Sequence, residues 1–310
     1  MNHLRQEVGY MTVCVAALAA SSRAIICVSD KALSYGGLIQ WDADCSKIIR
    51  LNPSGAVAMI SDNGNGPRIL DALFEKACDV GNAGRAAIRK TCEDQYRKAL
   101  DDLVEGTLLR PRQLNRETYL GALTAGQAND IIRSLADEIR AFDMDCDLLV
   151  CGLDEENKPF IFDIGSPGIA RDMSRTGFQA IGSGWEKAVS RLLFSEHKAD
   201  HTIERVLYDC FDAKANAEMA VGVGFEWDAE ILLGGTLGSY QVPREIKEII
   251  ESAWSKYQRS PFEKFDRKEH GEGPPRDWKE ILQEFSDLIV KASLNNPDAL
   301  QKLKDYGKGN

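Results

Sequence analysis

Short runs rich in apolar residues, separated by turn-forming residues, dominate the first sixty residues of the chain. The runs have the length of strands, and they cover residues 12–19, 24–29, 46–51 and 56–61. Apolar runs of this length that lack strict alternation are typical of strands buried on both faces. We therefore predict four strands in this region, and we expect them to form one sheet.

The spacing of apolar residues changes to a helical period after residue 66. Apolar residues recur every three or four positions in three segments, at residues 67–77, 88–103 and 131–142. Pro67 occupies a favoured position in the first turn of the first of these helices. We predict that the three helices form a layer on the sheet and that residues 110–118, which are rich in charge, form a loop.

Strand patterns return after residue 146. We predict two strands at residues 147–153 and 159–164, then a helix that contains Ala188, Leu192 and Leu193, a second helix at residues 203–221, and a last strand at residues 229–233. The complete order of strands, helices, strands, helices and strand is typical of a layered α+β domain.

The chain changes character after Pro243. We divide it into a leader or misassigned start (1–11), one domain (12–242) and a helical C-terminal extension (243–310). Residues 258–277 are rich in charge, glycine and proline, which is typical of a mobile linker. The amphipathic helix that follows either packs back on the domain or binds a partner. We favour packing on the domain.

The composition mainly excludes certain classes of partner and a membrane-spanning segment. The chain has 310 residues, 44% hydrophobic content and a formal net charge of −10. This negative charge argues against nucleic acid or an anionic membrane surface as the main partner. No apolar run approaches the ~18–20 residues of a membrane span. Because Glu7 lies beside the first apolar stretch, a signal peptide is disfavoured, and we expect a cytoplasmic protein.

The cysteines and histidines show no clear metal-binding or disulfide pattern. Eight cysteines are scattered along the chain, which favours buried free thiols in a reducing compartment. Among four dispersed histidines, His197 and His201 have the i, i+4 spacing of a helical metal site. They lie in a charged, turn-like segment with no third ligand nearby. We interpret it as a solvated loop, and we expect neither a metal nor a cofactor.

Thr12, Asp30 and Lys47 together offer the chemistry of a threonine nucleophile. A threonine hydroxyl is a poor nucleophile at neutral pH and needs an adjacent base. If Thr12 were the first residue, its own α-amine, with an ordinary pKa of ~7.7–8.0, would be that base. An ammonium at Lys47 would favour the neutral amine by like-charge repulsion, and Asp30 would keep the lysine charged. While Met11 is attached, the nitrogen of Thr12 is an amide and cannot accept the proton.

Three segments of the chain together carry a resemblance to a known family. The segments are TVCVAALAASSRAIICVSDKALS, SKIIRLNPSGAVAMIS, and DLLVCGLDEENKPFIFDIGSPG followed by FQAIGSG. In this order and spacing they resemble the N-terminal-nucleophile hydrolases of the proteasome β-subunit type. The resemblance covers roughly residues 12–233. It implies an α+β fold, a four-layer αββα sandwich, and hydrolysis of peptide bonds by a freed threonine.

The resemblance also implies a residue for each role in an active site. These are the nucleophile Thr12, the acid Asp30, the lysine Lys47, an oxyanion donor at Asn63 or Gly64, and Ser183 as a serine near the terminal amine. Each of four residues also has an ordinary interpretation, which stays open. Thr12 is then a strand residue, Asp30 a turn former, Lys47 a surface charge and Ser183 a helix N-cap. Cys14 points to the same side as Thr12, and we interpret it as a buried, inert thiol.

Two departures from the family pattern keep a second function open. Met11 stands where self-processing members have glycine, although removal of an initiator methionine here would also expose Thr12. The loop at residues 221–224 has neither the Asp nor the Ser that usually supports the amine. The first hypothesis is therefore a threonine hydrolase that cleaves peptides or small amides. The second is a non-catalytic, proteasome-like scaffold subunit that keeps its leader.

The resemblance bears on partners as well. It implies a homo-oligomer built as a ring or a stack, with a peptide or small amide as substrate. The sequence does not indicate whether an unfoldase partner exists.

Overall fold

The structure of the chain is a computed structural model that describes most residues between Thr12 and Tyr306. The described residues are 12–35, 39–42, 46–51, 56–61, 69, 73, 84–125, 130–220, 223–234, 238–257, 276–293 and 297–306. Three predicted features lie outside the described residues. They are the leader at residues 1–11, the oxyanion residues Asn63 and Gly64, and residues 258–275 of the predicted linker.

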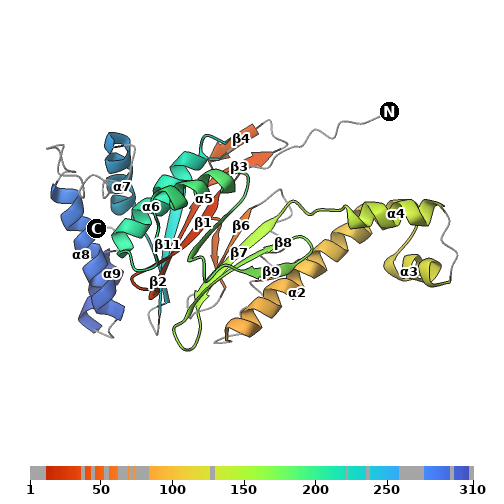
Figure 1. Cartoon of the computed structure of the whole chain (residues 1–310), viewed down its shortest axis with the longest axis horizontal. Helices are drawn as coiled ribbons and strands as arrows, with labels where there is room; N and C mark the ends of the chain where they lie inside the picture. The colour runs from red at the N-terminus through yellow and green to blue at the C-terminus, as the bar shows by residue number, and fades with distance from the viewer. Residues whose placement is uncertain are drawn as a thin grey trace.

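Within the described residues, two five-stranded antiparallel sheets form the centre of the molecule (Figure 1). The first sheet has the order β10 (Phe178–Ile181), β1 (Cys14–Ala19), β2 (Ala24–Asp30), β11 (Trp227–Leu233) and β12 (Gly238–Gln241). The second has the order β5 (Ile48–Arg50), β6 (Val57–Ser61), β7 (Asp147–Leu153), β8 (Pro159–Gly165) and β9 (Ile169–Asp172). A separate hairpin joins β3 (Ala32–Tyr35) and β4 (Ile39–Asp42). The predicted α+β class is therefore confirmed.

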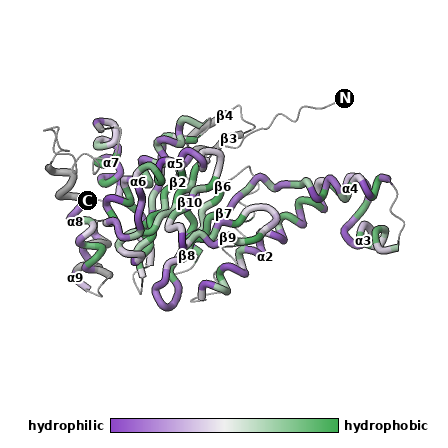
Figure 2. Tube along the Cα trace, in the orientation of Figure 1, coloured by the Kyte–Doolittle hydropathy of each residue, from purple (hydrophilic) through white to green (hydrophobic). Residues whose placement is uncertain are grey.

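The two sheets pack face to face around a shared hydrophobic core. Alternate residues of a strand point in opposite directions. Cys14, Ala16 and Leu18 of β1 join the core shared with β6 and β7 of the second sheet, whereas Val15 and Ala17 join a core under helices. Both faces of β1 and β2 are buried. This explains their continuous apolar runs. Figure 2 shows hydrophobic residues concentrated in the central strands, β2 among them.

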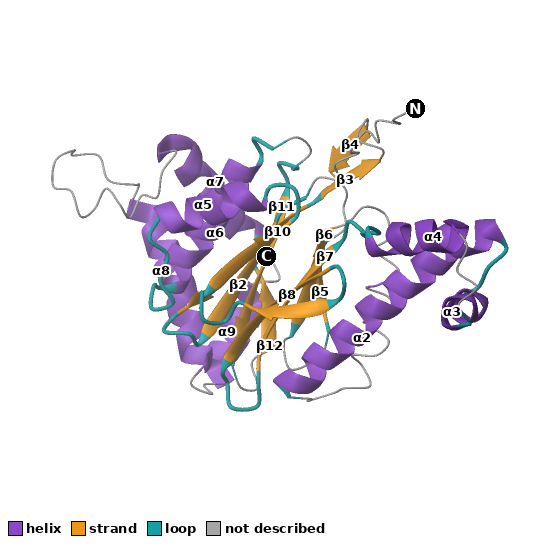
Figure 3. Ribbon diagram, turned by 45° about the vertical axis from the view of Figure 1, so that its right-hand side comes forward, coloured by secondary structure: helices purple, strands orange, loops and turns teal. Residues whose placement is uncertain are grey.

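Helices cover the outer face of each sheet (Figure 3). Side chains of α5 (Trp185–Phe194) and α6 (Ile203–Ala217) share a core with the first sheet. On the second sheet, α2 (Arg85–Val104) packs through three buried residues, Ile88, Cys92 and Tyr96. Among the helices that the structure describes, none combines the length and apolar character needed to cross a bilayer.

The prediction that the first four strands form one sheet is wrong. β1 and β2 lie in the first sheet, whereas β5 and β6 lie in the second. The chain changes sheets after β2, along a segment that includes the β3–β4 hairpin, which we did not predict. A continuous apolar run shows that a strand is buried on both faces, but it does not show which strand lies beside it.

The segment at residues 110–118, predicted as a loop, is helical at most positions. It follows a π-helical turn, η1 (Glu105–Leu109), and contains a 3-10 turn, η2 (Arg110–Arg112). It ends inside α3 (Arg116–Thr124), where Asn115 and Thr118 form a reciprocal capping box. We predicted a loop because the segment is rich in charged residues. The spacing of Asn115 and Thr118 indicates instead that a helix starts here.

Helices α3 and α4 (Asp130–Arg140) form an arm that extends beyond the sheets (Figure 1). Together with η1 they enclose a small separate core of Leu109, Tyr119, Ile132 and Leu135. The prediction that the central helices cover the sheet is therefore right for α2 and wrong for α4. Of the helix predicted at residues 67–77, the structure describes Ile69 and Leu73, and both are buried in the same core as α2.

The C-terminal extension packs back on the helices of the first sheet. Its described helices are α7 (Arg244–Tyr257), α8 (Arg276–Ser293) and α9 (Pro297–Tyr306). Phe285 and Ile289 of α8 are buried in the core that contains α6. Trp254 Nε1 of α7 donates a hydrogen bond of 2.8 Å to Asp212 Oδ1 of α6. The favoured interpretation of the amphipathic helix is thus confirmed.

Candidate active site

Thr12, Asp30 and Lys47 lie together where the two sheets meet. Thr12 comes just before β1, and Asp30 is the last residue of β2. Because β1 and β2 are antiparallel, with Cys14 opposite Ser29, the start of β1 lies beside the end of β2. Lys47 directly precedes β5, so the second sheet supplies the lysine. Thr12 and Lys47, which are 35 positions apart in the sequence, therefore meet only because the two sheets face each other.

The three side chains form a closed set of hydrogen bonds. Thr12 Oγ1 donates to Asp30 Oδ1 over 2.5 Å. Lys47 Nζ donates to the same Oδ1 over 2.9 Å and also donates to Thr12 Oγ1. The exposed fractions are only 2% for Thr12, 0% for Asp30 and 6% for Lys47. The interpretations of Asp30 as an ordinary turn former and of Lys47 as a surface charge are therefore wrong.

Two backbone N–H groups complete the surroundings of Asp30. The N–H of Val13 donates to Oδ1 over 2.9 Å, and the N–H of Gly224 donates to Oδ2 over 3.1 Å. Gly224 belongs to the loop at residues 221–224, which we noted for its missing Asp and Ser. The loop contributes its backbone to the acid, and a backbone donor leaves no trace in the pattern of side chains.

The segment Gly182-Ser183-Gly184 surrounds the carbonyl group of Thr12. Ser183 Oγ donates to this carbonyl oxygen over 3.5 Å, which is long, and the N–H of Gly184 donates to it over 3.3 Å. Gly182 has φ of +91°, and a Cβ there would lie 2.3 Å from the Thr12 oxygen. The N-cap residue of α5 is Gly184, so the interpretation of Ser183 as that cap is wrong.

The electrostatics of the site favour a reactive hydroxyl. An ammonium hydrogen-bonded to Thr12 Oγ1 stabilises negative charge as it develops on that oxygen. The carboxylate of Asp30 balances the charge of Lys47, and its backbone donors offset part of the cost of burying the pair. The predicted oxyanion donors, Asn63 and Gly64, lie outside the described residues.

Cys14 does not share this activation. Its Sγ lies 3.6 Å from the carbonyl oxygen of Ile60 and is fully buried. Burial raises the pKa of this thiol to about 12, against the opposing influence of Lys47. At neutral pH the thiol is therefore protonated and is a poor nucleophile.

Comparison with known proteins identifies a fold and no closer relationship. No protein-family model matches the chain, and no curated protein matches it. Among solved structures, Anbu (ancestral beta-subunit) from Yersinia bercovieri is 13% identical, with a TM-score of 0.56 over 84% of this chain and 100% of that chain. A mutant Anbu (Gly-1) from Hyphomicrobium sp. strain MC1 is 14% identical, with a TM-score of 0.53 over 84% of this chain and 99% of that chain.

These neighbours correct the resemblance drawn from the sequence. The chain has a proteasome-like fold, but the similar structures are Anbu proteins, which form a family distinct from the proteasome β-subunit type. Assignment to the proteasome β-subunit type is therefore wrong. At 13% and 14% identity the likeness extends to the fold alone.

Proposed function

We propose that the protein is a threonine-type N-terminal-nucleophile hydrolase that cleaves peptide or amide bonds, with Thr12 as its nucleophile. The observation that carries this proposal is the buried, mutually hydrogen-bonded set of Thr12, Asp30 and Lys47. A lysine without a role in chemistry is rarely buried against a hydroxyl, because desolvation of its charge is costly.

The proposed reaction begins once the bond between Met11 and Thr12 is cut. The freed α-amine of Thr12 takes the hydroxyl proton as Oγ1 attacks the carbonyl carbon of the substrate. Lys47 stabilises charge on Oγ1, and a backbone N–H at Asn63 or Gly64 is the proposed donor to the oxyanion. The tetrahedral intermediate collapses to an ester on Thr12, and the leaving amine departs with the proton. Water then hydrolyses the ester and restores the hydroxyl.

The proposal is tested by the mass of the chain and by covalent labelling. We expect the natively expressed protein to begin at Thr12 and to gain one equivalent of a β-lactone or epoxyketone, as seen by intact-mass spectrometry. Thr12→Ala should abolish the label. A chain that keeps Met11 and takes up no label would contradict the proposal.

A second candidate is a non-catalytic scaffold subunit that keeps its leader. Two features favour it: Met11 in place of glycine before the threonine, and the absence of Asp and Ser from residues 221–224. The backbone contact from Gly224 to Asp30 reduces the weight of the second feature, because the loop still supports the acid.

The proposed function carries expectations about architecture and assembly. We infer a four-layer αββα domain over residues 12–242, supported by the helices that pack outside each of the two facing sheets. Residues 243–310 form a helical extension of it. We also propose a cytoplasmic homo-oligomer, in the form of a ring or stack, which negative-stain electron microscopy of the purified protein tests directly.

A further inference from the structure

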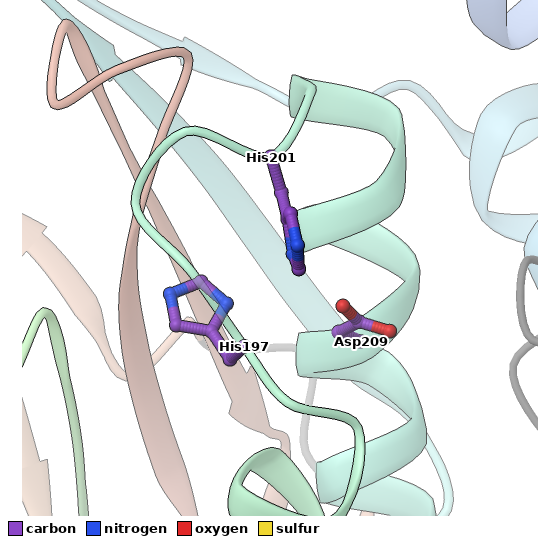
Figure 4. Close-up of side chains that lie close together, drawn as sticks. All are labelled: His197, His201 and Asp209. Atoms are coloured by element: carbon purple, nitrogen blue, oxygen red, sulfur yellow. The ribbon is translucent and has the colours of Figure 1, made fainter.

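A second cluster of chemically capable side chains lies at the far end of the first sheet. Among the described residues, His197, His201 and Asp209 form a group in which one potential ligand atom from each residue lies within 4.8 Å of the others (Figure 4). Asp209 is the third ligand that we did not find near the two histidines in the sequence. It lies eight positions beyond His201, on helix α6.

The backbone holds the loop that carries the two histidines in a defined position. The N–H of Ala20, in the turn between β1 and β2, donates to the His201 carbonyl oxygen over 2.8 Å. The N–H of Ser22 in the same turn donates to the Ala199 carbonyl oxygen over 3.1 Å. The His197 ring packs edge-on against Phe178, with ring centroids 5.5 Å apart. The loop exposes Lys198 and Asp200 to solvent, as expected, but its histidines are half-buried. The cluster therefore joins a loop held by backbone hydrogen bonds to a buried helix position.

The imidazole nitrogens are available to a ligand. Both ring nitrogens of His197 are buried and have no hydrogen bond of normal geometry within the described part of the chain, although the ring interacts with the backbone of Gly177. His201 Nδ1 accepts one long bond of 3.4 Å from the N–H of Lys198, which is weak.

We propose that His197, His201 and Asp209 bind a divalent transition-metal ion, with Zn²⁺ as the best-suited ion. Two imidazoles and one carboxylate are a common donor set for zinc, which leaves a fourth position for water. Tetrahedral zinc with bonds of ~2.0–2.1 Å requires donor atoms roughly 3.3 Å apart. The potential ligand atoms lie within 4.8 Å of one another, so binding would require side-chain rotations that shorten the longest separation.

Arg205 is the natural competitor of the ion. Its Nε lies 3.6 Å from Asp209 Oδ2, one helical turn away on α6. Binding of an ion therefore requires the carboxylate to exchange a guanidinium for the metal. The ion would link the loop before α6 to the helix itself, and it would stabilise the folded protein by an amount that grows with the logarithm of the ratio of free ion concentration to Kd.

The proposed metal site is independent of the proposed hydrolase function. Thr12 precedes β1, whereas the loop carrying His201 is bonded to the turn that follows β1. At ~3.3 Å per residue the two sites are more than about 20 Å apart. The ion would therefore act on structure and would not touch the substrate.

The test is a titration of the metal-free full-length protein with ZnCl₂ at pH 7.5, followed by calorimetry. We expect one equivalent to bind with a micromolar or lower dissociation constant and to raise the melting temperature by a few degrees. Failure to bind below about 100 μM would overturn the proposal. Because the readout is binding, this outcome would leave the role of Thr12 untouched.

Matched variants make the test specific. His201→Gln and Asp209→Asn should each weaken binding on the order of 100-fold or more, with circular dichroism confirming that they fold. The control is Asp137→Asn, which removes an exposed carboxylate on α4 and should leave the affinity unchanged. Equal affinity in His201→Gln and the wild type, or a loss in Asp137→Asn, would overturn the proposal.

Arg205→Gln gives a result in the opposite direction. Removal of the competing guanidinium should tighten Zn²⁺ binding up to about tenfold, because a cation that competes with the metal for the Asp209 carboxylate is then absent. Affinity that is unchanged or weaker would show that the carboxylate is not a ligand and would overturn the site as proposed.

Discussion

The two ends of the β1–β2 hairpin each adjoin a buried carboxylate, and the two carboxylates have very different partners. At the open end, Asp30 accepts hydrogen bonds from Lys47, from Thr12 and from two backbone N–H groups. At the turn end, Asp209 faces Arg205 at 3.6 Å and lies beside two imidazole rings. The first carboxylate has donors at hydrogen-bond distance, whereas the guanidinium that faces the second lies 3.6 Å away.

The difference follows from how a buried charge is stabilised. A carboxylate removed from water requires donors at hydrogen-bond distance, and an ammonium with oriented N–H groups meets this need. Such a set is preorganised for chemistry on the hydroxyl that it includes. Imidazoles near a carboxylate with a more distant cation are instead suited to an added ion. Substitutions at the open end should therefore affect activity and stability most.

The largest expected effect is the loss of activity in Thr12→Ala. If Thr12 is the nucleophile, removal of its hydroxyl should lower peptide or amide hydrolysis at least about 10³-fold. Lys47 and Asp30 still pair over 2.9 Å in its absence, so the free energy of unfolding should fall by only ~1 kcal/mol. Steady-state kinetics and urea unfolding measure the two quantities.

Thr12→Ser is the matched control for this prediction. Serine keeps the hydroxyl and, after removal of Met11, the terminal amine, so measurable hydrolysis and labelling should persist. If Thr12→Ala retains full activity, Asp30 and Lys47 form a structural ion pair with no role in catalysis. The open end of the hairpin would then differ from the proposed metal-binding end only in its contribution to stability.

The next largest effect is the destabilisation of the fold by Lys47→Met. Asp30 is fully buried and would lose its cation. Breaking a buried pair in this way costs about 3–5 kcal/mol in unfolding free energy. Activity should fall as well, because the charge beside Thr12 Oγ1 is removed.

A double-mutant cycle separates the pair from its members. Asp30→Asn combined with Lys47→Met removes both charges, so the double variant should lose less stability than the sum of the single variants. Additive losses in urea unfolding would show that the two side chains stabilise the fold independently of each other.

Gly182→Ala should have a smaller effect, confined to the backbone around Thr12. Its φ of +91° disfavours any side chain, and the new Cβ would lie 2.3 Å from the Thr12 carbonyl oxygen. We expect a loss of about 2–4 kcal/mol in unfolding free energy. Gly177→Ala is the control, because Gly177 has a similar φ of +82°. A Cβ added there would lie no closer than 4.0 Å to its nearest neighbour, Leu18 Cδ1. It should lose only ~1 kcal/mol. Equal losses would mean that contact with Thr12 contributes nothing.

Local patterns predicted individual elements well, and they failed where a distant partner decides the outcome. β7 begins and ends at the predicted residues, 147 and 153, because turns bound its apolar run on both sides. The placement of β5 and β6 in the sheet of β7, rather than in the sheet of β2, depends on contacts far apart in sequence. Apolar content cannot encode that choice.

The candidate site shows the same division. Thr12, Asp30 and Lys47 were found because their side chains carry the chemistry. Gly224 was missed because it contributes only a backbone N–H. Asp209 was missed because it follows His201 by eight residues, across the start of α6, where no simple periodicity applies. Side-chain chemistry is visible in a sequence, whereas backbone donors and tertiary neighbours require the fold.

The smallest expected effect concerns a third carboxyl group, Asp147, at the start of β7. Burial, followed by the nearby charge of Asp163, raises its pKa from 3.8 to about 6. Between these pH values the folded protein binds more protons than the unfolded chain, so the free energy of unfolding falls as pH rises through this window. Above pH 6 the ionised group therefore destabilises the fold, in contrast to the well-bonded Asp30.

Asp147→Asn should remove this cost. At pH 8 the variant should gain about 1–3 kcal/mol in unfolding free energy over the wild type, the upper value being the whole pKa shift expressed as energy. At pH 4 or below the difference should approach zero, because Asp147 is then largely protonated in the folded protein. Urea unfolding at both pH values measures the gain, with the exposed Asp137→Asn on α4 as a control that should show little change. If the variant is instead less stable at pH 8, hydrogen-bond donors stabilise the Asp147 carboxylate, as they stabilise Asp30. Burial alone would then not decide which carboxylates in this fold lower the free energy of unfolding.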